Sequence, residues 1–155
     1  MPTPDFILEL RRHVGTAPLW LTGVTAVVLR GREVLLVRRA DNGAWTPVTG
    51  IVDPGEEPAV AAVREVLEEA DVVATAQRLA SVAVTEEVVY DNGDRTQYLD
   101  LTFRCDFVSG RPHPADGENT EARWCDVDDL PPMTERMRSR IADALPERGE
   151  ALFRA

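Results

Sequence analysis

The feature that most constrains this chain is a helical segment that begins at Pro58 and runs to about Ala70 without a breaking residue. Proline is favoured at the first helical position, and the turn-forming residues Asp53-Pro54-Gly55 precede it. With about 100° between successive residues, one face of this helix is apolar and another carries three carboxylates at i, i+3 and i+4. The apolar residues are Ala59, Ala62, Val63, Val66, Leu67 and Ala70, and the carboxylates are Glu65, Glu68 and Glu69.

Three carboxylates at this spacing repel one another, so either solvent or a cation must compensate their charge. The simplest interpretation is an acidic helix face in water, because runs of charge are usually solvated. The alternative is a divalent metal site, since converging carboxylate oxygens are suitable ligands for Mg²⁺ or Mn²⁺. The helix alone leaves both interpretations open.

The flanking segments predict an α/β (α+β) fold in which helices and strands alternate irregularly around a mixed sheet. We expect strands over residues 19–29, 33–38, 78–89, 97–108 and 121–127, a short extended piece over 45–50, and further helices over 5–14 and 134–144. Hairpin turns are expected at Arg30-Gly31-Arg32 and at Asp91-Asn92-Gly93-Asp94. We divide the chain into an N-terminal helix with its lead-in, residues 1–18, and a single domain, residues 19–155.

Composition limits the possible partners. The 155 residues are enough for one buried core, and the net charge of −10 argues against a nucleic-acid or membrane-surface binder. All 17 cationic side chains are arginines, so Schiff-base and P-loop lysines are excluded. The N-terminus lacks the pattern of a secretory signal, and we expect a cytoplasmic protein with reduced Cys105 and Cys125. A disulfide between these two cysteines stays open if their strands are adjacent.

A longer spaced pattern surrounds the acidic helix. It reads glycine, five residues, glutamate, seven residues, Arg-Glu-aliphatic, one residue, Glu-Glu, two residues and an aliphatic residue. The residues at these positions are Gly50, Glu56, Arg64, Glu65, Val66, Glu68, Glu69 and Val72. This pattern resembles the Nudix box, the signature of the Nudix hydrolases, and the resemblance extends over about residues 19–145. Asp71 stands where the family has glycine, but aspartate tolerates a left-handed conformation better than most residues.

The resemblance implies a Nudix-type α/β/α sandwich with a mixed central sheet, and a hydrolase that cleaves a nucleoside diphosphate linked to another group. It also implies that Glu65, Glu68 and Glu69, with the Gly50 carbonyl, bind Mg²⁺ (or Mn²⁺), and that these glutamates are catalytic. Arg64 is expected to pair with Glu56 and to orient the loop that leads into the helix. Outside the box, Glu118 is the candidate general base, with Glu121 as the runner-up and Glu86 and Glu87 as weaker candidates.

Two arginines and several aromatic residues are candidates for substrate binding. Arg38 and Arg39 end a predicted strand, and arginine binds phosphate in a bidentate manner. Tyr90 is a candidate for stacking on a base, as are Trp20, Trp45 and Tyr98. We expect a small-molecule nucleotide as the partner, with neither nucleic acid nor membrane, and a homodimer is a further possibility in which the N-terminal helix forms part of the interface.

The substrate itself stays open among a modified nucleoside triphosphate, a dinucleoside polyphosphate and a nucleotide sugar. Nudix enzymes that cleave ADP-ribose often carry a proline after the box, and this chain has no proline between Pro58 and Pro112, which counts against that subgroup. Dinucleoside polyphosphate hydrolases of the family often carry a tyrosine in the same region, where this chain has Tyr90. The alternative function is a non-catalytic Nudix-fold module that binds or senses a nucleotide. An isoprenoid diphosphate isomerase is disfavoured because the extra Cys and Glu residues of that chemistry are not recognisable.

Overall fold

The strand β1 (Leu19–Arg30) is the centre of the sheet in the computed structural model, which describes residues 3–155. It pairs in parallel with β7 (Arg95–Gly110) and antiparallel with β2 (Glu33–Arg39) and β4 (Val48–Ile51). The remaining strands extend this centre: β3 (Trp45–Thr46) and β8 (Asn119–Asp126) pair with β2, and β5 (Val72–Val84) and β6 (Val88–Val89) pair with β7. The mixed sheet predicted from the sequence is confirmed.

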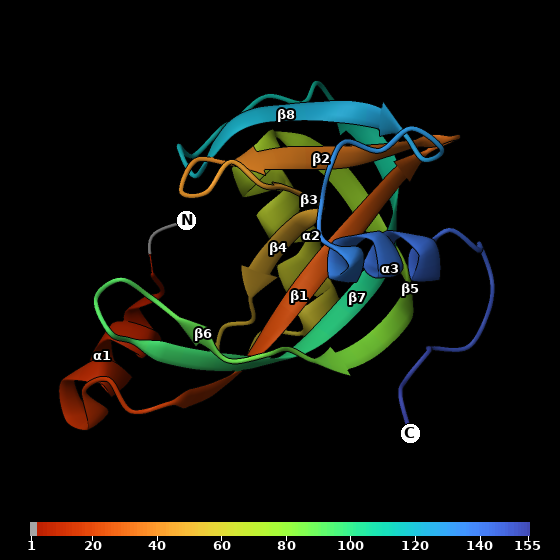
Figure 1. Ribbon diagram of the computed structural model, residues 1–155. Helices are drawn as coiled ribbons and strands as arrows, with labels where there is room; N and C mark the ends of the chain where they lie inside the picture. The colour runs from red at the N-terminus through yellow and green to blue at the C-terminus, as the bar shows by residue number, and fades with distance from the viewer. Residues whose placement is uncertain (1–2) are drawn as a thin grey trace.

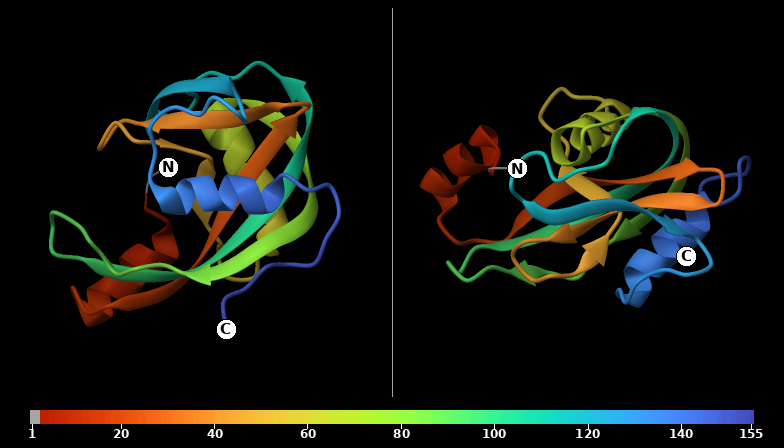
Figure 2. Two further views of the ribbon diagram at one scale, coloured as in Figure 1. Left: turned by 45° about the vertical axis from the view of Figure 1, so that its right-hand side comes forward. Right: turned by 90° about the horizontal axis from the view of Figure 1, so that it is seen from above.

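Two helices cover opposite faces of this sheet, and Figures 1 and 2 show the three layers. Alternate residues of β1 point to opposite faces, so this strand contributes to both cores. Val24, Ala26 and Val28 pack under α2 (Pro58–Ala70), whereas Val27 and Leu29 pack under α3 (Glu135–Ala144). The α/β/α sandwich is confirmed.

A third helix, α1 (Asp5–Val14), stands apart from the two layers, beside the β6–β7 hairpin (Figure 1). Arg11 ties it there, because its guanidinium donates hydrogen bonds to the Arg95 carbonyl (2.7 Å) and the Thr96 hydroxyl (3.2 Å). The predicted helix over 5–14 is confirmed, while residues 1–2 of the predicted N-terminal segment lie outside the described residues. No helix in residues 3–155 has the length and apolar character needed to cross a membrane.

The prediction for the strand after α2 was wrong at its start. β5 begins at Val72, directly after the helix, and not at Arg78. Register shifts between Val73 and Ala74, and again between Ala76 and Arg78, interrupt its pairing with β7. Such bulges break the alternation on which strand prediction rests, and the alanines in this stretch have low β-propensity.

The predicted apolar face of α2 was partly wrong. Leu67 is 49% exposed, whereas Ala61 is fully buried. The buried sector is rotated toward β4 and includes Glu65 and Glu69, because the helix packs against this strand as well as against β5. The interpretation of the carboxylates as a fully solvated face is therefore wrong for these two residues.

The two cysteines are free thiols. Cys105 lies in the core under α2 and Cys125 in the core under α3, so the sheet separates them. The disulfide left open by the sequence is not formed. Burial raises the pKa of both thiols, which keeps them in the protonated, less reactive form.

The left-handed residue that ends α2 provides a first test. Asp71 has φ 54° and ψ 39°, and its N–H donates to the Leu67 carbonyl. We expect Asp71→Gly to raise the free energy of unfolding by about 0.5 kcal/mol, because glycine has no Cβ to clash in this conformation. We expect Asp71→Val to lower it by about 1–2 kcal/mol, because a β-branched side chain clashes strongly here. Urea unfolding measures both changes. Equal stability of the two variants would contradict the assignment.

Candidate active site

The three carboxylates of α2 lie in different environments. Glu65 is fully buried and Glu69 is 4% exposed, whereas the Glu68 side chain is 43% exposed. The helix thus turns two ionisable groups inward and leaves the third at the surface. Since charged groups are rarely buried without partners, the contacts of Glu65 and Glu69 define the site.

Glu65 packs against the backbone of Gly50 on β4. A Cβ placed on Gly50 would lie 2.2 Å from both Cγ and Cδ of Glu65, so only glycine fits here. Oε1 of Glu65 accepts a hydrogen bond from Nη1 of Arg64 (2.9 Å), whereas the buried Oε2 has no hydrogen-bond partner. A buried carboxylate oxygen that accepts no hydrogen bond has the lone pairs that a cation ligand needs.

Arg64 organises the surroundings of this carboxylate. Its Nε and Nη2 donate to the two oxygens of Glu56 (2.8 and 2.9 Å), and Nη1 also reaches Glu68 (3.2 Å). Nη2 further donates to the Ile51 carbonyl on β4 (3.3 Å). The expected pair between Arg64 and Glu56 is present, and it connects the loop before α2 to the acidic helix.

A second acidic group forms where the loop between β7 and β8 returns to α2. One carboxylate oxygen each from Glu69, Asp116 and Glu118 lies within 4.8 Å of the others. Nδ2 of Asn119 donates to Oε2 of Glu69 (2.9 Å). The loop is held by two backbone hydrogen bonds, from His113 N to Ala70 O (3.2 Å) and from Ala115 N to Glu69 O (3.1 Å).

The sequence pointed to Glu118 in this group but not to Asp116 or Asn119. Neither has a spacing that marks it, because Asp116 lies in the loop before β8 and Asn119 begins β8 directly after that loop, whose path local sequence pattern does not predict. Their proximity to Glu69 depends on the return of the chain from β7, which only the tertiary structure specifies.

Burial dominates the electrostatics of the site. It raises the pKa of Glu65 to about 7 and that of Glu69 to about 7, with Arg64 and Asn119 respectively opposing the shift. The hydrogen bonds from Arg64 lower the pKa of Glu56. Hard oxygen donors, an orphaned buried oxygen and a side-chain-free backbone at Gly50 together fit a divalent cation.

A cleft of about 590 Å³ adjoins these carboxylates. Gly50, Glu69 and Glu118 line one part of it, and Arg39 and Tyr90 of the predicted substrate-binding residues line it as well. Arg38 is not among the lining residues; it contacts the Gly43 carbonyl (3.2 Å) and Glu121 (3.0 Å) instead. Arg39 donates to both oxygens of Asp41, which also lines the cleft.

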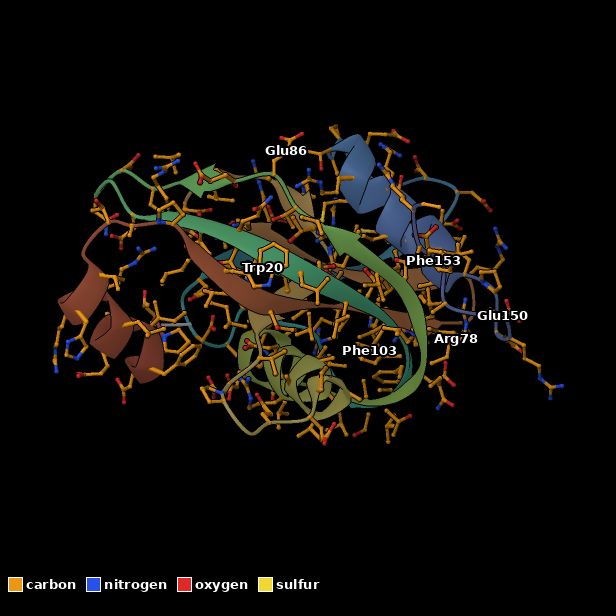
Figure 3. The ribbon with its side chains drawn as sticks, turned by 90° about the horizontal axis from the view of Figure 1, so that it is seen from below. Trp20, Arg78, Glu86, Phe103, Glu150 and Phe153 are labelled. Atoms are coloured by element: carbon orange, nitrogen blue, oxygen red, sulfur yellow. The ribbon has the colours of Figure 1, made fainter. Side chains whose placement is uncertain are left out.

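Three of the four aromatic candidates line the cleft. Trp45, Tyr90 and Tyr98 line the cleft, and the hydroxyls of the two tyrosines are 3.1 Å apart. Trp20 does not line it; it lies exposed on the sheet, in the view that Figure 3 gives from below.

The weaker candidates for a base lie outside the cleft. Glu86 projects at the outer edge of the molecule near α3 (Figure 3), where it pairs with Arg136 at 3.7 Å. Glu87 pairs with Arg95 (2.8 Å), and Glu121 pairs with Arg38. Of the predicted carboxylates outside the box, Glu118 alone lines the cleft.

Comparison with known proteins agrees with this geometry. The model of the NUDIX domain matches residues 20–147, which is most of the chain. The chain therefore belongs to the Nudix family. Residues of α1 precede the matched region.

Two relatives illustrate the range of the family. The chain is 34% identical over 135 residues to a MutT-like protein of Streptomyces ambofaciens, covering 85% of this chain and 81% of the relative. It is 36% identical over 109 residues to the NAD-capped RNA hydrolase NudC of Pseudomonas aeruginosa, covering 69% of this chain. The match spans only 36% of the length of NudC.

Solved structures share the fold. A UDP-X diphosphatase superposes with a TM-score of 0.69 at 20% identity, over 97% of this chain and 74% of that one. An ADP-ribose pyrophosphatase of Streptococcus suis superposes with a TM-score of 0.67 at 22% identity, over 86% of this chain and 98% of that one. At this identity the likeness concerns the fold alone.

The contact between Gly50 and Glu65 can be tested by Gly50→Ala. The added methyl group must displace the Glu65 side chain, so we expect the affinity for Mn²⁺ to fall by about 10–100-fold. Electron paramagnetic resonance of free Mn²⁺ measures this affinity. Gly31→Ala, in the turn between β1 and β2, is the control because it adds the same methyl group where no atom lies within 4 Å. Wild-type affinity in a folded Gly50→Ala variant would contradict the assignment.

The raised pKa values predict a pH dependence of the metal-free protein. The ordinary pKa of a glutamate is 4.5, whereas Glu65 and Glu69 have pKa values of about 7 in the folded protein. Between these two pH values, the two glutamates bind more protons in the folded protein than in the unfolded chain. The free energy of unfolding should therefore fall as the pH rises through this window. Urea unfolding in EDTA at about pH 5 and about pH 8 measures the difference.

Glu69→Gln should reduce this pH-dependent loss of stability, whereas Glu57→Gln, at an exposed position just before α2, should not. Adding Mg²⁺ should oppose the loss, since the cation binds the deprotonated carboxylates. An unchanged pH dependence in Glu69→Gln would contradict the contribution of this residue.

Proposed function

We propose that this chain is a Mg²⁺- or Mn²⁺-dependent pyrophosphohydrolase that cleaves the diphosphate linkage of a small nucleoside diphosphate derivative. The observation that carries the proposal is the buried Oε2 of Glu65, which has no donor and lies on the helix that also presents Glu69 to the cleft. A stability role alone gives no reason to bury two carboxylates on one helix.

In this proposal Glu65, Glu68 and Glu69 hold the cation together with the Gly50 carbonyl. The cation, when bound, neutralises the charge of the diphosphate and lowers the pKa of a water molecule. Arg64 keeps Glu65 and Glu68 in place through its hydrogen bonds to both, and Glu56 holds Arg64 in turn. This arrangement supports an orienting role for Arg64 and Glu56, and not direct contact with substrate.

The attacking water needs a proton acceptor. A carboxylate oxygen of Glu118 is our candidate, because Glu118 lines the cleft beside Glu69. Asp116, within the same acidic group, is the alternative that the geometry adds. Arg39, which lines the cleft, is our candidate to contact a phosphate, and Tyr90 and Tyr98 are our candidates for stacking on the remainder of the substrate.

The substrate class is narrower than the family as a whole. A cleft of about 590 Å³ suits a small molecule, and the net charge of −10 disfavours a nucleic-acid partner. The NudC relative is named for NAD-capped RNA, which supports a nucleoside diphosphate derivative as the substrate class. The free cysteines support a cytoplasmic location, and a homodimer stays a prediction.

A panel of nucleotides incubated with Mg²⁺, read by identification of both products, tests the proposal. The panel should include modified nucleoside triphosphates, dinucleoside polyphosphates and nucleotide sugars. Metal-dependent cleavage between two phosphates is the expected result. Tight nucleotide binding without turnover of any member would instead favour the non-catalytic sensor.

Glu68→Gln gives a sharper test. We expect it to lower kcat by at least about 100-fold with little change in the free energy of unfolding, because Glu68 is exposed and its loss removes a cation ligand. Glu57→Gln is the matched control and should keep wild-type activity. Full activity of Glu68→Gln would mean that the carboxylate is merely solvated.

A further inference from the structure

The floor of the cleft contains a polar cluster that the proposed hydrolysis does not use. Here β1 and β7 run in parallel, and their residues pair as Leu21 with Tyr98, Gly23 with Asp100 and Thr25 with Thr102. The first two pairs line the cleft. The floor is therefore apolar and aromatic at the first pair, and it carries the carboxylate of Asp100 at the second pair.

Gly23 leaves a gap in this floor. Its backbone is not left-handed, so no dihedral constraint requires glycine at this position. A Cβ here would lie 3.3 Å from Cδ1 of Tyr98 and 3.4 Å from Oδ1 of Asp100. The absence of a side chain thus lets a flat group approach the sheet between the tyrosine ring and the carboxylate.

Asp100 has spare capacity to accept a hydrogen bond. It is 5% exposed, and its Oδ2 receives the hydroxyls of Thr25 (3.1 Å) and Thr102 (3.3 Å) and lies 3.4 Å from Nε of Arg140. Oδ1 has the Thr25 hydroxyl as its hydrogen-bond donor, at 3.2 Å. This hydroxyl carries one hydrogen, which cannot be donated fully to both oxygens of Asp100. The less satisfied oxygen is the one that faces the gap at Gly23.

The cluster is also anchored by α3. Arg140, on α3, is buried, lines the cleft and donates to the Thr25 hydroxyl through Nη1 (3.0 Å). Asp100 is thereby held in one orientation by the sheet and by α3. The proposed cation site is close to this cluster, because Gly50 and Ile51 on β4 pair directly with Val24 and Gly23 on β1.

We propose that this floor is a base-recognition subsite, in which Asp100 accepts a hydrogen bond from an exocyclic amine of a planar heterocycle lying over Gly23. The inference rests on the proposed function for the presence of a nucleotide in the cleft. Adenine and cytosine present such an amine, whereas hypoxanthine and uracil place a keto oxygen there, whose lone pairs face the carboxylate unfavourably. The subsite therefore selects amino-bearing nucleotides over their oxo counterparts.

The test compares binding of AMP with IMP and of CMP with UMP to the full chain by calorimetry. Each pair differs at the amine or oxo position, and the readout does not depend on turnover. We expect the wild-type protein to bind AMP and CMP at least about 10-fold more tightly than IMP and UMP. Equal affinities within each pair, or no binding of any of the four, would overturn the proposal.

Asp100→Asn assigns the preference to this residue. Its amide oxygen should take the position that receives Arg140, Thr25 and Thr102, so that the NH₂ group faces the gap and donates to a keto oxygen. We expect the preference for AMP and CMP to disappear or reverse. Asp106→Asn, the same change on the same strand but outside the cleft, should keep the wild-type preference. An unchanged preference in folded Asp100→Asn would overturn the proposal.

Gly23→Ala tests the same floor if Asp100→Asn does not fold. Its methyl group should fill the gap and weaken all four nucleotides by at least about 10-fold, and wild-type affinities in this variant would overturn the proposal. Hydrolysis of the nucleotide panel is measured on the same protein. Metal-dependent hydrolysis without amine preference overturns the base subsite alone, whereas amine preference without any hydrolysis overturns only the proposed function.

Discussion

The burial of Glu65 and Glu69 on one helix is the constraint on which the rest of this structure depends. Transferring a carboxylate out of water costs several kcal/mol unless partners replace the lost solvation. Arg64 supplies part of that replacement to Glu65, and Asn119 supplies part to Glu69. The pKa of each glutamate is nevertheless raised to about 7, so the protein groups alone do not fully compensate the two charges.

This shortfall explains the packing around α2. β4 must place a glycine opposite Glu65, because any side chain at residue 50 would occupy the space of the carboxylate. The loop after β7 must return to the end of the helix, where its N–H groups bind the Ala70 and Glu69 carbonyls. Those carbonyls lie in the last turn of α2, where carbonyl groups have no N–H donors within the helix. One set of contacts therefore caps the helix and brings Asp116 and Glu118 to Glu69.

Much of the fold was readable from the sequence because its signals are local. Pro58 at the start of α2, the turn at Asp91-Asn92-Gly93-Asp94 and the substitution at Asp71 each predicted the observed backbone. The start of β5 was not readable, since bulges interrupt its alternation. The burial of Glu65 was also hidden, because helical periodicity shows which residues share a face but not how far a neighbouring strand covers it.

The candidate site divides in the same way. The residues of α2 and Gly50 were readable because a spaced motif joins them, and Glu118 was found through the resemblance to a family. Asp116 and Asn119 were not, since their contact with Glu69 joins segments about fifty residues apart and depends on how the sheet orders β7 and β8. Neither a motif nor a periodicity carries information about such a contact.

The charges around the cleft show how an acidic chain can accommodate a polyanion. With no lysine in the chain, every cationic side chain is a guanidinium, whose planar set of donors fixes its orientation when it is paired. Arg39 is oriented by Asp41, and Arg140 by Asp100 and Thr25. The positive groups at the cleft are thus fixed by neighbouring acceptors and do not create a broad positive field. In the proposed function, attraction of a diphosphate comes mainly from a cation at the acidic helix, and the cleft contributes geometry. The carboxylates that would otherwise repel the substrate are then the groups that recruit its counter-charge.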